Sequence, residues 1–397
     1  MRKVAVTGIG SINALGRGVD EFANALREGR SGIGALSVLD PAGFRVALAA
    51  QVTDLRAPAA LSRATARRAS RSALLVLVAA QEAWGMAGLT TDSGGDAGVV
   101  IGTTTGGMSM GEQNYGPSGP RLSRWLESPV SVPTDVLAQT FSISGPRVTV
   151  STACSSGANA LGIAADWIRA GRAAVVLCGG TDSLCRGTYA GFDSLQALDP
   201  AGCRPFDKHR AGLTIGEGAA LFVLEDWERA LRRRTPILGE LVSYGVSADA
   251  HHLTQPRPDG AGAVLAMQRA LQEGGVAAGE IDYINAHGTG TPLNDVIETR
   301  AIKTVFGAHA YAIPVTSTKS MVGHCLGAAG AIEALASLLA IRGGFVPPTV
   351  SLDTPDPECD LDYVPAKSRP ARLRTVLSNS YGFGGNNTSV VLRGHEG

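Results

Sequence analysis

The chain has 397 residues, enough to bury a large core, and this length suits either two domains or one α/β unit of two related halves. It carries 35 basic and 35 acidic residues, so its zero formal charge gives no global reason to expect nucleic acid or a membrane surface as partner. Six cysteines without C-x-x-C or metal-ligand spacing predict reduced thiols and no zinc site. Since we find neither a secretion signal nor an uncharged run long enough to span a bilayer, we expect a cytoplasmic protein.

Short apolar runs alternate with helical patterns along the chain. Continuous apolar runs are typical of strands covered by helices on both faces, which predicts an α/β layered architecture. The predicted strands are residues 3–9, 97–103, 147–152, 173–180, 219–226, 281–287, 313–319, 375–380 and 388–394. The predicted helices are residues 19–28, 63–87, 157–169, 261–273, 294–306 and 327–341.

One order of elements occurs twice, with a strand and a Gly-rich turn, then helices, then a closing pair of strands. The first closing pair is predicted at 219–226 and 239–248, and the second at 375–385 and 387–394. The segment 248–260, ADAHHLTQPRPDG, is rich in turn-forming residues. We therefore expect an N-terminal half at 1–248 and a C-terminal half at 249–397.

A small thiol, Cys154, stands where the apolar run RVTVST meets the helical pattern SSGANALGIAADWIRAGR. The start of a helix carries partial positive charge and free N–H groups, which favour a thiolate and can bind an oxyanion. On this stretch alone, an inert buried cysteine is the better interpretation. The remaining motifs favour a nucleophile.

Two histidines follow predicted strands. In IDYINAHGTGTPLND, His287 ends a strand, and a helix follows with Thr291 as N-cap and Pro292 at its first position. In VTSTKSMVGHCLGAAG, a strand runs to Lys319 and His324 opens a helix. A histidine buried in the core is commoner than a catalytic one, but two at equivalent turns favour a shared site.

Asp295 and Glu298 are three residues apart on the helix after His287, so both could orient a histidine or pair with Lys319. An ordinary surface ion pair is the alternative.

In SNSYGFGGNNTS, Phe383 stands between glycines in a tight turn, where a backbone N–H could point at a ligand. A plain hairpin turn explains this last motif equally well.

Five separated motifs occur in a fixed order: GTTTGG, TACSSG, RPFDKHRAG with GEG, NAHGTGTPLND with STKSMVGHCLGAAG, and GFGGNN. Together they resemble the β-ketoacyl-[acyl carrier protein] synthases, over nearly the whole chain. The resemblance implies the thiolase fold, two duplicated halves in five α-β-α-β-α layers. It also implies decarboxylative condensation of an acyl thioester with malonyl-[acyl carrier protein], without a metal or redox cofactor.

Carried over to this chain, the resemblance makes Cys154 the acylated nucleophile. Phe383 becomes the gating phenylalanine, whose N–H completes an oxyanion hole with that of Cys154.

The resemblance also implies that His287 and His324 are the pair of imidazoles that stabilises the enolate. Lys319 and Glu298 become their supporting ion pair. A pair of histidines is typical of the elongating synthases, whereas starter enzymes carry His and Asn. Thiolases use a second cysteine in a Gly-rich turn, which Cys359 lacks.

Three positions depart from the family pattern. Ala211 and Leu213 replace an acid and an aromatic residue, and Asn386 stands where Thr is usual. The departures concern the gate and the pocket, so they favour a polyketide or secondary-metabolite synthase over housekeeping fatty acid elongation. A non-catalytic chain-length-factor-like subunit is the alternative, although the nucleophile speaks against it.

The expected partners are an acidic acyl carrier protein and a second subunit, either another copy or a chain-length-factor homologue. Arg63, Arg67 and Arg71 share a predicted helical face, and Arg67 and Arg68 match basic carrier-docking positions of the family. A solvated helix face is the alternative for each of these arginines.

Overall fold

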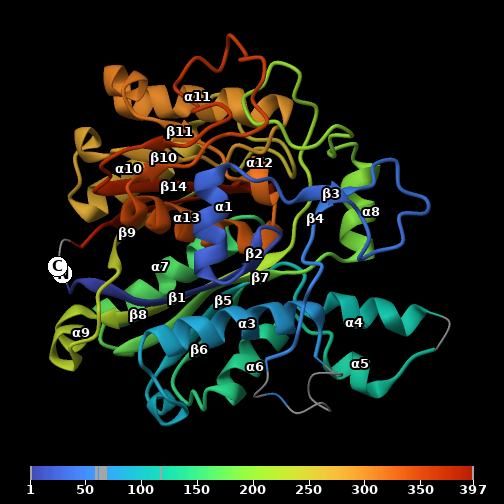
Figure 1. Cartoon of the computed structure of the whole chain (residues 1–397), viewed down its shortest axis with the longest axis vertical. Helices are drawn as coiled ribbons and strands as arrows, with labels where there is room; N and C mark the ends of the chain where they lie inside the picture. Colours follow the sequence, from blue (N-terminus) through green and yellow to red (C-terminus); the bar gives the residue numbers. More distant parts are fainter. Residues whose placement is uncertain (1, 59–60, 62–68, 117–118, 396–397) are drawn as a thin grey trace.

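The computed structural model describes residues 2–58, 61, 69–116 and 119–395, and its helices and strands are arranged in layers (Figure 1). The strands are β1 (Val4–Asn13), β2 (Gly16–Arg17), β3 (Ile33–Ala35), β4 (Leu48–Ala50), β5 (Gly98–Gly102), β6 (Arg147–Val150), β7 (Val175–Asp182), β8 (Gly218–Asp226), β9 (Gly239–Ala248), β10 (Tyr283–Asn285), β11 (Val315–Thr316), β12 (Phe345–Val346), β13 (Arg369–Pro370), β14 (Thr375–Gly382) and β15 (Asn386–Arg393). The helices are α1 (Val19–Glu28), α3 (Arg71–Met86), α4 (Met108–Glu112), α5 (Leu122–Leu126), α6 (Val132–Thr140), α7 (Ser156–Arg169), α8 (Arg186–Ser194), α9 (Trp227–Arg233), α10 (Ala261–Gly274), α11 (Pro292–Phe306), α12 (Lys319–Val322) and α13 (Ala329–Gly343).

The strand order confirms the predicted duplication. The first half has the order β6-β5-β7-β8-β1 and the second has β11-β10-β14-β15-β9. In both halves the first three strands pair in parallel and the last two join antiparallel. The strands of the two halves meet at β1 and β9, which pair at Ala5 with Glu240 and at Val6 with Gly239.

The position of β9 corrects the predicted boundary between the halves. We expected residues 239–248 to close the first half, but β9 pairs with β15 along most of its length and occupies the place that β1 has in the first half. The repeat therefore changes between β8 and β9, before residue 239 rather than after 248. Sequence pattern alone could not assign β9, because an apolar strand looks the same in either half.

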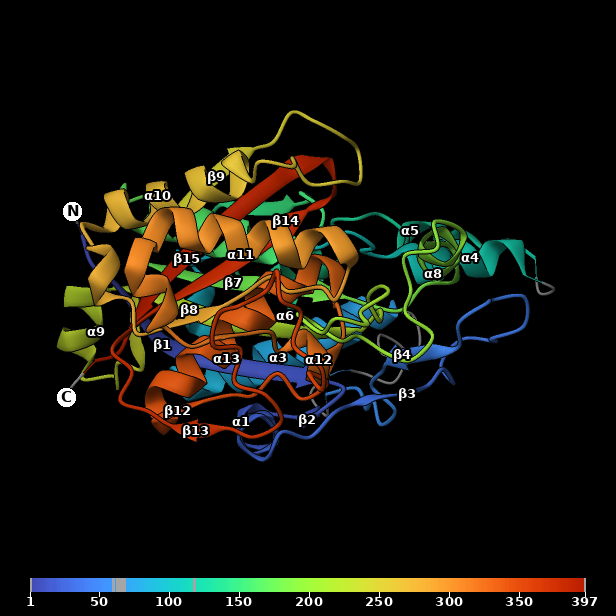
Figure 2. The ribbon, with the colours of Figure 1, turned by 90° about the horizontal axis from the view of Figure 1, so that it is seen from above.

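Alternating side chains on the strands explain the layers. On β7, Val176 and Cys178 face a central cluster with α7 and α13, whereas Val175 and Leu177 face an outer cluster with α3 and α6. In the second half, side chains of β10, β14 and β15 face α10 and α11. The order is thus helices, sheet, α7 and α13, sheet, helices, which is the expected five-layered architecture (Figures 1 and 2).

Two predicted element boundaries were wrong. The helix expected from residue 63 begins at Arg71, where the Ser70 side chain accepts from the N–H of Ala73 and caps it. The predicted strand to Lys319 ends at Thr316, and Lys319 opens the short helix α12. His324 therefore lies in the turn between α12 and α13 and does not open a helix directly after a strand, as we expected.

Helix α13 forms the centre of the molecule. The segment Leu326–Gly343 is long and apolar enough to cross a membrane by length and composition, but 83% of it is buried inside the protein. Its neighbour α7 is packed closely, because a Cβ on Gly157 would lie 2.9 Å from the N of Ala331. This apolar segment is a core helix between the two sheets.

Candidate active site

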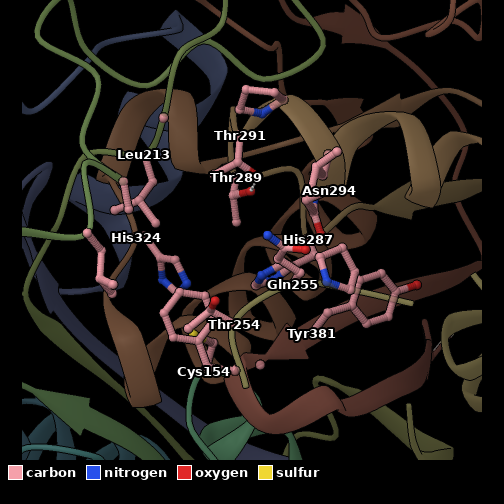
Figure 3. Close-up of a pocket in the computed structure, with 18 of the residues that line it drawn as sticks. Cys154, Leu213, Thr254, Gln255, His287, Thr289, Thr291, Asn294, His324 and Tyr381 are labelled. Atoms are coloured by element: carbon pink, nitrogen blue, oxygen red, sulfur yellow. Dashed lines mark hydrogen bonds between the residues drawn. The ribbon is translucent and has the colours of Figure 1, made fainter. Parts of the chain in front are cut away.

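A cavity of about 370 Å³ lies where the two halves meet (Figure 3). Cys154 from the first half lines it, together with His287, His324 and Phe383 from the second half. The structure thus brings together four side chains that are far apart in the sequence.

Cys154 lies in the loop between β6 and α7, two residues before the helix begins. Ala153, just before it, has a φ of +52°, a left-handed conformation that costs a residue with a Cβ about 1 kcal/mol or more. The side chain of Cys154 is only 6% exposed. Burial raises the pKa of its thiol to about 11, although the Lys319 ammonium and a hydrogen bond from the Phe383 backbone act to lower it. The resting thiol is therefore protonated at neutral pH.

Phe383 lies in the tight turn between β14 and β15, as predicted. Gly384 and Gly385 have φ values of +80° and +75°, which glycine adopts without strain. A Cβ on Gly382 would lie 3.0 Å from the backbone N of Cys154, so the turn packs directly against the loop that carries Cys154. The Phe383 ring stacks on Phe192 of α8, with centroids 5.6 Å apart and an interplanar angle of 24°.

His287 follows β10, and α11 begins after it with Thr291 as N-cap and proline in the first turn, as predicted. The Glu298 carboxylate accepts the N–H of His287 at 2.9 Å and that of Gly288 at 2.8 Å. The Lys319 ammonium donates to the His287 carbonyl at 2.6 Å and lies 3.3 Å from Nδ1. With Nδ1 facing a donor, the imidazole carries its proton on Nε2.

His324 reaches the same tautomer by another contact. Its Nδ1 accepts the N–H of Leu326 at 3.1 Å, so Nε2 carries the proton. The His287 and His324 rings are nearly perpendicular, at 84°, with centroids 5.4 Å apart. Burial and the nearby Lys319 charge hold the pKa of both histidines well below 6.5, so both are neutral N–H donors.

The predicted ion pair between Lys319 and Glu298 is wrong. Lys319 pairs with Glu333 of α13, and both side chains are at most 2% exposed. Glu298 instead accepts backbone N–H groups and the side-chain amide of Asn379 at 3.2 Å. Burial raises the pKa of both Glu298 and Glu333 to about 7.

Asp295 does not orient a histidine either. Its carboxylate accepts the N–H of Phe206 at 2.8 Å and lies 3.9 Å from Arg210. It therefore fixes the segment RPFDKHR against α11.

The three departures from the family pattern lie at the cavity or at the turn that carries Phe383. Ala211 and Leu213 line the cavity. The side-chain amide of Asn386 donates to the Phe383 carbonyl at 3.1 Å, so this residue ties down the turn that carries the phenylalanine.

Of the arginines considered for carrier docking, Arg63, Arg67 and Arg68 lie outside the described residues. Arg71 lies at the start of α3, where its guanidinium donates to both carboxylate oxygens of the fully buried Glu217 at 2.6 and 2.7 Å. The charge of Arg71 is therefore compensated by a buried carboxylate of the same chain.

Sequence reasoning missed three contributors to the site, Glu333, Phe192 and Asn379. Glu333 had a readable signal, because it is the one acid in the apolar run AGAIEALASLLAI and a buried charge requires a partner. Nothing in the sequence indicated that Phe192 and Asn379 would lie beside Phe383 and Glu298.

Comparisons with known proteins agree with this geometry. Family profiles described as "Beta-ketoacyl synthase, N-terminal domain" and "Beta-ketoacyl synthase, C-terminal domain" match residues 1–230 and 238–353. The chain is 41% identical to 3-oxoacyl-[acyl-carrier-protein] synthase 2 of Synechocystis sp., covering 100% of this chain and 99% of that protein.

Two solved structures are also similar over the whole chain. The ishigamide ketosynthase/chain length factor has a TM-score of 0.92 and 37% identity, covering 99% of both chains. A type II polyketide ketosynthase bound to a hexaketide, in complex with its acyl carrier protein, has a TM-score of 0.90 and 32% identity, covering 100% of both chains.

The layers and the cysteine–histidine site define a ketosynthase of the thiolase fold. The chain belongs to the β-ketoacyl synthase family, and its activity is that of an acyltransferase that makes 3-oxoacyl thioesters for fatty acid or polyketide synthesis. The matched profiles divide between β8 and β9, where the strand order also changes.

Proposed function

We propose that this protein extends an acyl chain held on Cys154 by decarboxylative condensation with malonyl-[acyl carrier protein]. One observation carries the proposal: two buried imidazoles, each with its Nδ1 facing an N–H donor, line the cavity that also contains the thiol, which leaves Nε2 of each ring to carry the proton. Two N–H donors can stabilise the negative oxygen of an enolate, which is the intermediate that such a condensation requires.

The first half-reaction transfers the acyl group. The sulfur of Cys154 attacks the acyl thioester on the carrier, the bond to the carrier sulfur breaks, and the thiol proton leaves with the released carrier thiol. The backbone N–H groups of Cys154 and Phe383 flank this position and stabilise the tetrahedral oxyanion.

The second half-reaction forms the carbon–carbon bond. The malonyl thioester loses CO₂, and the Nε2–H groups of His287 and His324 hold the resulting enolate oxygen. The enolate carbon attacks the acyl carbonyl on Cys154, the carbon–sulfur bond breaks, and the thiolate takes up one proton. The product is a β-ketoacyl thioester two carbons longer, and these steps use only groups of this chain and its two substrates.

We propose an acyl carrier protein as the substrate donor, and either a second copy or a chain-length-factor homologue as the partner subunit. Two similar structures support these assignments, because one contains a chain length factor and the other a carrier protein. The changes at Ala211, Leu213 and Asn386 lie at the gate, and they favour an acyl chain other than a housekeeping fatty acid.

Intact-protein mass spectrometry tests the proposal. The native protein and Cys154→Ser are incubated with a panel of acyl carrier thioesters, and malonyl carrier is then added. We expect an acyl adduct only on the native protein, and its conversion to a β-ketoacyl carrier two carbons longer. If no donor gives an adduct, alone or with candidate partner subunits, the chain is a non-catalytic subunit and the proposal is wrong.

A further inference from the structure

A buried carboxylate outside the cavity contacts the turn that carries His324. Asp182 is the last residue of β7 and its side chain is 0% exposed. Its Oδ2 accepts the backbone N–H of Gly327 at 2.6 Å. A Cβ on Gly327 would lie 2.8 Å from this oxygen, so only glycine allows the turn to approach so closely.

The loop GTTTGG after β5 surrounds the same carboxylate. Oδ1 accepts the hydroxyls of Thr103 and Thr105 at 2.6 and 2.7 Å, and the N–H of Thr105 at 2.8 Å. Oδ2 accepts the Thr104 hydroxyl at 2.5 Å, and the Thr104 N–H reaches both oxygens at 3.0 Å. Within the described residues, every hydrogen bond to Asp182 comes from a neutral donor.

Leu326 connects Gly327, which Asp182 contacts, with the ring of His324. Leu326 has a φ of +49°, a left-handed conformation that a leucine adopts only when its surroundings impose it. Its N–H donates to Nδ1 of His324 at 3.1 Å, and this bond places the imidazole proton on Nε2. The Gly327 N–H that Asp182 accepts is the next one along the chain.

We propose that Asp182 is a positioning residue for His324: by binding the Gly327 N–H it holds Leu326 in its left-handed conformation, and so keeps Nε2–H of His324 directed at the enolate. This inference rests on the proposed function. Asp182 does not line the cavity and so has no contact with the substrate.

A carboxylate suits this place better than an amide. Each oxygen of Asp182 accepts at least one backbone N–H, so an asparagine would turn its NH₂ toward the N–H of either Gly327 or Thr105. Hydroxyls can rotate to accept, whereas a backbone N–H cannot. Asp182→Asn therefore keeps the volume and disturbs the contacts, and Asp182→Glu keeps the two acceptors.

The matched control is Glu225→Gln. Glu225 is also 0% exposed and pairs with Val175 at the opposite end of β7, about 23 Å away for seven residues at 3.3 Å each. It contacts Thr7, Arg229 and Arg233 and no residue of the site.

The experiment separates the two half-reactions. Acylation of Cys154 is followed by mass spectrometry, and decarboxylation by the release of CO₂ from malonyl carrier. For Asp182→Asn we expect decarboxylation to fall at least 10-fold while acylation stays within about 2-fold, with Asp182→Glu recovering part of the loss. Glu225→Gln should match the native protein in both rates. Equal loss of both half-reactions, or no loss, would overturn the inference.

A second measurement does not depend on activity. The ¹⁵N shifts of selectively labelled histidine report which imidazole nitrogen carries the proton, with His324→Ala providing the assignment. We expect the His324 tautomer to become mixed in Asp182→Asn and to stay unchanged in Glu225→Gln. If Asp182→Asn does not fold, Thr104→Val removes one hydroxyl from Oδ2 and should show a smaller change in the same direction. A native protein without acylation contradicts the proposed function, whereas an unchanged tautomer contradicts only this inference.

Discussion

The Lys319 ammonium lies 3.3 Å from Nδ1 of His287, and no part of it is exposed to solvent. The same ammonium pairs with Glu333 and donates to the His287 carbonyl. One buried charge thus fixes the backbone of His287, the tautomer of its ring and the position of α13. A substitution here should affect stability and chemistry by different routes.

We expect Lys319→Met to lower the free energy of unfolding by up to about 3–5 kcal/mol at a pH where Glu333 is ionised, because it leaves this carboxylate buried without its partner. The loss should be smaller below pH 7, because the pKa of Glu333 is already raised to about 7 and the carboxyl then takes up a proton. The double variant Lys319→Met with Glu333→Gln removes the unpaired charge and should recover part of this stability. Decarboxylation should stay low in both, since His287 loses the donor at Nδ1. Denaturant unfolding and CO₂ release measure the two effects, and recovery of decarboxylation in the double variant would contradict the role of Lys319.

Each histidine can be tested by its removal. We expect His287→Ala and His324→Ala to slow decarboxylation about 100-fold or more, which is typical for loss of one oxyanion donor. Acylation of Cys154 should change much less, because the oxyanion hole that we propose for that step consists of the backbone N–H groups of Cys154 and Phe383. Single-turnover assays of each half-reaction measure this split, and a variant that loses only acylation would contradict the assignment.

The pH dependence of decarboxylation follows from the low pKa of both histidines. A group with an ordinary histidine pKa would titrate near 6.5, but burial and Lys319 hold the pKa of His287 and His324 well below this value. Both rings therefore keep the neutral form between pH 6 and 8. We expect a decarboxylation rate that is flat over this range, and a midpoint near 6.5 that disappears in His324→Ala would show that the ring is charged.

The thiol of Cys154 should react slowly with alkylating reagents in the resting protein. With a pKa of about 11, only about 1 in 10⁴ of the thiol is ionised at pH 7. The alkylation rate should increase about 10-fold per pH unit up to pH 10. Peptide mapping after iodoacetamide, with Cys154→Ser as control, measures it, and a rate that levels off near pH 7 would indicate a resting thiolate.

The stability of the protein should depend on pH through Glu298. Its pKa is about 7 in the folded protein against 4.5 for the unfolded chain, so the folded state holds its proton more tightly. The free energy of unfolding therefore falls as pH rises from 4.5 to 7, by about 3 kcal/mol from this group at 1.36 kcal/mol per unit, and changes little above. Glu298→Gln removes the ionisable group and should reduce this slope, although its NH₂ must face one of the two N–H groups that the carboxylate accepts. Parallel slopes for both proteins in urea unfolding at pH 5, 6, 7 and 8 would refute the assignment.

The three arginines Arg67, Arg68 and Arg71 should separate into two groups. Arg71→Ala leaves Glu217 buried without its ion pair, and we expect a loss of unfolding free energy of about 3 kcal/mol and an unchanged KM for the carrier. Reversing the charges of Arg67 and Arg68 should raise that KM instead, more at low salt than at high salt. An unchanged KM in the charge-reversed variant leaves these two arginines as ordinary surface residues.

The sequence predicted the layered fold, the duplication and the grouping of Cys154, His287, His324 and Phe383, since each lies beside a strong local signal of a strand end, a cap or a glycine turn. It failed for the partner of Lys319. Glu298 belongs to the same motif as His287, but its carboxylate accepts the backbone N–H of His287. Lys319 reaches Glu333 only because α13 packs between the two sheets. Contacts set by tertiary packing rather than by local pattern, such as Asp182 with Gly327, leave no comparable mark in the sequence.

The Cys154 thiol belongs to one half of the molecule, and the His287 and His324 imidazoles and the Phe383 ring belong to the other. Neither half alone, even if folded, would therefore contain both the thiol and the two imidazoles. The few strand contacts between β1 and β9, and the close fit of α7 against α13, set the distance between nucleophile and donors. The turnover rate should therefore depend on how accurately the two halves are aligned. Substitutions buried between α7 and α13 should lower this rate before they unfold the protein.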